Sequence, residues 1–158
     1  MFEQYLKALI DGLHQKIAIL DKLTEYTSKQ QTIVSQPEVD WDQFDKTIDD
    51  KDELIQKLVA ADEGFQAIYD RVKDDVSANK DKYKQYISEM QRLIGIVTEK
   101  STSLMALEQR TKVKVANGFG TQRQKVNRTK ASSKVANSYY NSMNKMNYID
   151  PQLMDTKK

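Results

Sequence analysis

Residues 35–44, SQPEVDWDQF, separate two long segments of helical periodicity and decide how those segments are arranged. Pro37 cannot donate the backbone hydrogen bond that an α-helix needs, and it biases Gln36 away from helical geometry. Asp40 can cap the free N–H groups of a new helix, and Gln43, three residues later, can complete a capping box. The stretch therefore predicts a short turn between two antiparallel helices.

Before this turn, apolar residues recur at intervals of three and four, which places them on one face of a helix. They are Phe2, Leu6, Leu9, Ile10, Leu13, Ile17, Leu20 and Leu23. The pattern predicts a first helix over about residues 2–34.

After the turn, a second helical segment combines an apolar face with an acidic back. The apolar positions are Trp41, Phe44, Ile48, Ile55, Leu58, Val59, Phe65, Ile68, Tyr69, Val72 and Val76. The pattern shifts in the stretch AADEGF, where Asp62 and Gly64 predict a kink or a one-turn break. Since large aromatic residues are usually buried, we expect Trp41 to anchor the core where the chain turns back.

A second turn is predicted in SANKDKY, residues 77–83, with Asn79 as a candidate helix cap. Apolar residues from Tyr83 to Leu107 then predict a third long helix that ends at about residue 115. Three long helices with two short connections give an all-α fold, an elongated antiparallel bundle similar to a helical hairpin or coiled coil.

We expect two parts, a helical bundle domain over residues 1–116 and a basic, partly flexible C-terminal tail over residues 117–158. The glycines of NGFG, residues 117–120, favour a flexible joint between them. Val135, Tyr139, Met143 and Met146 recur at intervals of four, four and three. Their spacing predicts a short amphipathic helix over residues 134–147.

Charge is distributed unevenly along the chain. Residues 38–82 hold 14 acids and 7 Lys or Arg, whereas residues 110–158 hold 11 Lys or Arg and 2 acids. Such a chain can fold its basic tail onto its acidic middle, or present each to a different partner.

The chemistry of most active sites is missing from the sequence. There is no cysteine, and His14 is the single histidine, so we expect no metal site of the usual zinc kind. His14 borders an apolar helix face and is best interpreted as a surface residue. The dense acids of DKTIDDKDE lack the central glycine of an EF-hand. We predict no catalytic residue, no cofactor, no small-molecule substrate and no enzymatic activity.

Two classes of non-enzymatic function remain open: binding of nucleic acid or a membrane surface, and structural self-association. The basic stretch from Thr111 to Lys134 contains no acid and could attract nucleic acid or a membrane surface. Phe119 is the one aromatic residue in it that could stack on bases, so we do not favour nucleic acid. Near-heptad spacing in the first helix would also permit a structural coiled coil that self-associates.

No apolar run reaches the ~20 residues of a membrane span, and no signal peptide is evident, which favours the cytoplasm.

Several of these features together resemble the FlgN-like family of flagellar export chaperones. The resemblance rests on the helix YLKALIDGLHQKIAILDKLTEYTSKQ, on DWDQFDKTIDDKDELIQKLVAAD with Lys51 in KDELIQKL, on a third long helix, and on a basic tail closing with YIDPQLMDTKK. It implies a cytoplasmic type III export chaperone that binds the helical C-terminal segment of hook-associated flagellar proteins and prevents their aggregation or premature assembly. The export apparatus is a second partner that the resemblance allows.

The resemblance also implies that the partner-binding residues lie in the C-terminal part of the chain. The corresponding apolar positions here are Val113, Val115, Phe119, Val126, Tyr139, Tyr140, Met143 and Met146. Methionine adapts to irregular surfaces and tyrosine combines an apolar ring with a polar tip, so these residue types suit a surface that receives a partner helix.

Overall fold

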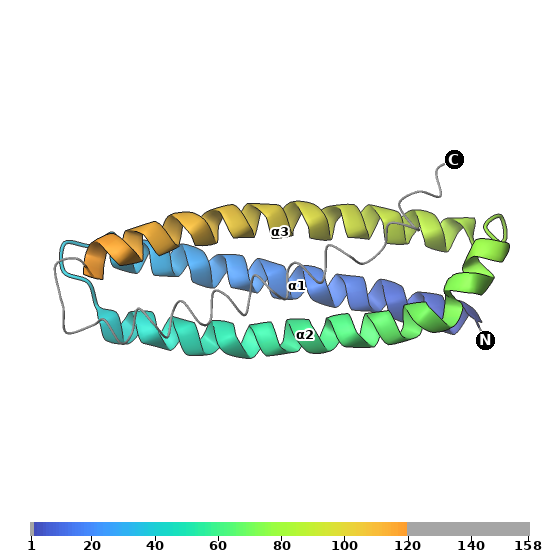
Figure 1. The fold of residues 1–158 in the computed structure, drawn as a ribbon, viewed down its shortest axis with the longest axis horizontal. Helices are drawn as coiled ribbons and strands as arrows, with labels where there is room; N and C mark the ends of the chain where they lie inside the picture. The colour runs from blue at the N-terminus through green and yellow to red at the C-terminus, as the bar shows by residue number, and fades with distance from the viewer. Residues whose placement is uncertain (1, 120–158) are drawn as a thin grey trace.

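A computed structural model describes residues 2–119 of the chain, with side chains as far as Gly118. This part contains three helices, α1 (Phe2–Val34), α2 (Trp41–Ala78) and α3 (Lys84–Phe119). Helix α2 runs antiparallel to α1 and α3, which run in the same direction, and the three form an elongated bundle (Figure 1). The predicted all-α fold is confirmed.

The first helix, α1, is the central element of the bundle. It packs closely against both α2 and α3, whereas the backbones of α2 and α3 hardly approach each other. Its buried side chains recur at intervals of three and four, because two neighbours cover one broad stripe of its surface. They are Leu6, Leu9, Leu13, Lys16, Leu20, Leu23, Thr27, Gln30, Ile33 and Val34.

The turn between α1 and α2 follows the sequence-based expectation. The helix α1 ends at Val34, and the side chain of Asp40 accepts a hydrogen bond of 3.1 Å from the backbone N–H of Gln43. Asp40 is therefore the N-cap of α2, because it satisfies one of the donors that the first turn leaves free.

Of the two alternatives predicted around Asp62 and Gly64, a kink or a one-turn break, the break is wrong. The helix α2 continues without interruption from Trp41 to Ala78. Asp62 is buried rather than part of a turn, and Phe65 continues the buried stripe beyond it. The shift in apolar pattern reflects a buried carboxylate in place of an apolar side chain.

Asn79 caps the C-terminal end of α2, as predicted. Its backbone N–H donates to the carbonyl oxygens of Asp75 and Val76, and its side-chain amide donates to the carbonyl of Asp75 at 2.9 Å. Five turn residues, 79–83, connect α2 to α3, and the last of them, Tyr83, is buried.

The third helix is longer than predicted, because it runs through Asn117 and Gly118 to Phe119. The flexible joint expected at residues 117–120 is therefore wrong for its first three residues. Val115 is buried, and Gly118 lies against the ring of Trp41, so tertiary contacts hold the last turn in place. Tertiary packing commonly overrides the low helix propensity of glycine.

Buried hydrophobic residues form two clusters. The larger comprises buried residues within 6–23, 55–76 and 83–104, toward the α2–α3 turn, and the smaller lies where the α1–α2 turn meets the end of α3. The smaller cluster consists of Ile33, Val34, Trp41, Phe44 and Val115. Trp41 is 1% exposed, so the prediction that it anchors the core is confirmed. None of the three described helices has the length and apolar character needed to cross a membrane.

Candidate functional site

The end of the bundle that carries the smaller cluster is also the end from which the chain continues toward its C-terminal residues. The rings of Trp41 and Phe44 meet edge to face, with centroids 5.5 Å apart. A Cβ atom added at Gly118 would lie 3.3 Å from the Cζ2 atom of Trp41, which is tighter than ordinary van der Waals contact. Gly118 thus allows the last turn of α3 to approach the indole closely.

Beside this cluster lies a group of four buried polar side chains contributed by all three helices. The Lys51 ammonium of α2 forms an ion pair with Oε1 of Glu108 in α3 and donates to Oε1 of Gln30 in α1 at 3.0 Å. Thr27 Oγ1 donates to the same carboxylate oxygen of Glu108 at 2.7 Å. We call these residues, Thr27, Gln30, Lys51 and Glu108, the polar cluster.

Burial sets the protonation properties of Lys51. Removal from water lowers the pKa of Lys51 from its ordinary value of 10.5, while the charge of Glu108 and its hydrogen bond act in the opposite direction. A buried charge is tolerated when it is paired and hydrogen-bonded, as Lys51 is here. The polar cluster is therefore a structural connection between the helices.

A second buried ion pair joins α1 to α2 nearer the middle of the molecule. Lys16 pairs with Asp62, and its ammonium also lies 5.3 Å from the ring centroid of Phe65. Burial again lowers the pKa of Lys16, and Asp62 partly opposes that shift. Asp62 therefore belongs to the core and not to the acidic back of α2.

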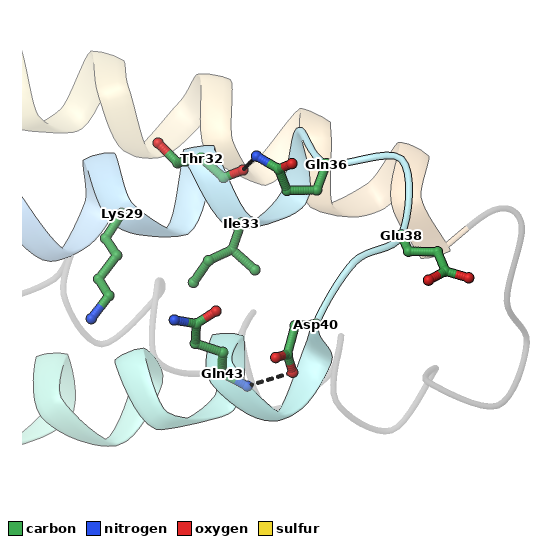
Figure 2. Close-up of a pocket in the computed structure, with 7 residues that line it drawn as sticks. All are labelled: Lys29, Thr32, Ile33, Gln36, Glu38, Asp40 and Gln43. Carbon is green, nitrogen blue, oxygen red and sulfur yellow. Dashed lines mark hydrogen bonds between the residues drawn. The ribbon is translucent and has the colours of Figure 1, made fainter.

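A shallow hollow of about 360 Å³ lies between the ends of α1 and α2 (Figure 2). Its lining residues are Lys29, Thr32, Ile33, Gln36, Glu38, Asp40 and Gln43. The side chain of Ile33 points into the hollow, and the amide of Gln36 donates to the carbonyl of Thr32 at 3.3 Å. The lining combines the apolar side chain of Ile33 with charged and amide side chains.

Within residues 2–118, no group of three His, Asp or Glu side chains is arranged to hold a metal ion. His14 is exposed on α1, as predicted.

The predicted partner-binding residues fall into three groups. Val113 is 54% exposed on α3, whereas Val115 is 5% exposed and belongs to the core. Phe119 is the last residue of α3. Five further residues lie outside the described part of the chain, namely Val126, Tyr139, Tyr140, Met143 and Met146.

A comparison with protein families matches residues 1–116 to the family described as FlgN protein. The chain belongs to the FlgN family. Searches of curated proteins and of solved structures returned no match. FlgN is a family of flagellar export chaperones and not of enzymes, so the general role of the chain is that of a chaperone in flagellar assembly.

The match to FlgN covers all of α1 and α2 and most of α3, and it therefore includes both buried ion pairs. Sequence periodicity contained a signal for these pairs, because Lys16 lies between Leu13 and Leu20 on the buried stripe and Lys51 lies between Phe44 and Ile55. Periodicity alone does not name the partner of a buried lysine, since Asp62 and Glu108 are on other helices.

Proposed function

We propose that this FlgN-family chain is a cytoplasmic chaperone that binds the helical C-terminal segment of hook-associated flagellar proteins. Binding keeps these client proteins from aggregating or assembling before type III export. Contact with the export apparatus is part of the same proposal.

The observation that carries the proposal is the scarcity of apolar surface on the bundle. Within the described residues, Val113 is the one large hydrophobic residue that is exposed. An amphipathic client helix needs an apolar surface to cover its own apolar face. The bundle offers little, so the residues that follow α3 must provide most of it.

The chain beyond α3 contains suitable side chains for this purpose. Tyr139, Tyr140, Met143 and Met146 provide aromatic rings and flexible thioethers within eight residues. Burial of such a side chain contributes about 1.5–3 kcal/mol before the cost of ordering the segment is subtracted. Several of them together account for a stable complex.

Val113 and Phe119 extend this surface toward the bundle. Val113 is exposed six residues before the end of α3, and Phe119 is its final residue. The packing of Gly118 on Trp41 holds this last turn in place, so the client-binding residues begin from a fixed point. Val115 supports that turn from the core and does not contact the client.

Calorimetry with the C-terminal segment of a hook-associated protein tests the proposal. We expect that combining Tyr139→Ser, Tyr140→Ser and Met143→Ser in the full chain abolishes binding, because it removes the apolar contacts. The matched control combines Lys125→Gln, Arg128→Gln and Lys130→Gln, which should weaken binding only by a modest factor at low salt.

The opposite pattern would contradict the proposal. If the aromatic variant keeps full affinity and the basic variant loses it, recognition is electrostatic. If the unmodified chain binds no such segment and only associates with itself, the bundle is a structural element.

A further inference from the structure

Outside the core, residues 41–59 of α2 present six acids and two bases, whereas residues 60–78 present four acids and two bases, so the first half of α2 has the more acidic surface. Asp42, Asp45, Asp49 and Asp52 follow at intervals of three, four and three, which places them on one face of the helix. We call these four residues the acidic face of α2. Asp42, Asp49 and Asp52 are exposed and Asp45 is half-buried.

The structure makes the surface of this half of α2 more acidic than its composition suggests. Residues 41–59, the first half of α2, contain three basic residues, Lys46, Lys51 and Lys57. The charge of Lys51 is directed into the core, where it pairs with Glu108. Lys46 and Lys57 are exposed, so six acids and two bases remain on the surface of this half of α2, which is therefore negative.

The acidic face begins beside the end of α3. Trp41, which starts α2, lies against Gly118 in the last turn of α3, and both are at the same end of the bundle (Figure 1). Asp45 follows Trp41 by one helical turn and lies on the same side of α2. The chain therefore leaves α3 at the start of the acidic face.

The segment that follows has the complementary charge. Residues 120–134 carry Arg123, Lys125, Arg128, Lys130 and Lys134, and no acid. Fifteen residues can span up to about 50 Å, while the rise of α2 from Trp41 to Asp52 is only about 17 Å. Length thus permits every base of the segment to reach the acidic face.

We propose that residues 120–134 bind in cis to the acidic face of α2. The bases form ion pairs with Asp42, Asp45, Asp49 and Asp52, and Val126 contacts Ile48, which is half-buried and packs against the smaller hydrophobic cluster. Single surface ion pairs are weak, but a tethered segment acts at an effective concentration on the order of millimolar. The contact is therefore populated at low salt and lost as salt screens the charges.

This contact would hold the Tyr and Met residues that follow it near the bundle until a client arrives. That consequence rests on the proposed function, whereas the contact itself does not. The test therefore uses the chain without any client.

Paramagnetic relaxation measures the contact directly. The chain has no cysteine, so Ser132→Cys gives a single site for a nitroxide label in the full-length protein. At low salt we expect the label to reduce the amide signals of residues 42–52 several-fold. Signals of residues 66–76, near the other end of α2, should change little.

Two matched variants show whether charge is the cause. Asp49→Lys with Asp52→Lys should restore the signals of residues 42–52. Asp70→Lys with Asp74→Lys makes the same change of charge on exposed residues of the same helix and should leave the effect intact. Each pair of substitutions also removes one carboxylate that accepts a hydrogen bond from a glutamine side chain. Asp52 accepts from Gln56, and Asp70 accepts from Gln66.

A third variant avoids any change to the bundle. Lys125→Gln with Arg128→Gln should also restore the signals, and it alters no residue of the three helices. The proposal is overturned if both halves of α2 respond equally or if the variants of the acidic face have no effect. It is also overturned if the broadening appears only between molecules, in a mixture of isotope-labelled and spin-labelled chains.

Discussion

The ammonium group of Lys51 lies in the core, and each of the three helices is represented among the residues of the polar cluster. Removal of one member of a buried ion pair commonly costs about 3–5 kcal/mol, because the other charge is left without a partner. Replacement of both members by apolar residues is far less costly. Lys51 and Glu108 therefore form one structural unit.

The lowered pKa of Lys51 predicts how stability depends on pH. In the window between this lowered pKa and the ordinary value of 10.5, the unfolded chain binds more protons at Lys51 than the folded chain. The free energy of unfolding contributed by this residue should therefore rise as pH rises through that window. Urea unfolding followed by circular dichroism, from neutral pH to pH 10.5, measures it.

The variant that combines Lys51→Met with Glu108→Met provides the control. Its free energy of unfolding should lack the rise that Lys51 contributes, so the difference from the unmodified chain should change with pH. A difference that stays constant would show that Lys51 keeps the same pKa in the folded and unfolded states.

In helix α3, one tertiary contact changes the expected effect of substituting a glycine. Around Gly95 no side chain or neighbouring backbone lies within 4 Å of an added Cβ, whereas at Gly118 the ring of Trp41 lies at 3.3 Å. The two glycines share a helix and differ in their surroundings. A methyl group has room beside Gly95, whereas Gly118 is closely packed.

Substitution by alanine should separate these two cases. Gly95→Ala should stabilise the chain by about 0.5–1 kcal/mol, because alanine loses less conformational entropy in a helix. Gly118→Ala should gain less or be destabilising, since its methyl group must displace the Trp41 ring. Urea unfolding compares them, and an equal gain at both sites would show that the contact with Trp41 is easily relaxed.

Local signals were sufficient to predict the three helices and the first turn. Pro37 and Asp40 act on their own neighbours, and apolar intervals of three and four report a buried stripe. The end of α3 was predicted too early, because Gly118 is held by Trp41, which lies far from it in the sequence. The partners of Lys16 and Lys51 were missed for the same reason, since they lie on other helices.

At the scale of the whole molecule, less of the candidate site than of the fold could be predicted from the sequence. Composition and the resemblance to a family directed attention to the C-terminal residues, but helical periodicity does not separate core from binding positions on one helix. Val113 and Val115 are two residues apart, yet one is exposed and the other belongs to the core. Only the position of α1 and α2 around α3 distinguishes them.

The division of the chain into a bundle and a tail remains a prediction, and truncation tests it. Residues 1–119 should melt cooperatively with high helix content, because both hydrophobic clusters lie within them. A chain ending at residue 116 loses the last turn against Trp41 and should melt a few degrees lower. If residues 1–119 are largely unfolded by circular dichroism, the tail is part of the core.

The two buried ion pairs also limit how the helices can slide along one another. A shift by one heptad, about 10 Å along the axis, would leave many apolar contacts of long amphipathic helices in place. It would, however, separate Lys16 from Asp62 and Lys51 from Glu108, and so leave buried charges without their partners. One pair aligns α1 with α2 and the other aligns α2 with α3. The bundle therefore has a single favoured alignment of its three helices, which fixes the position of the end of α3.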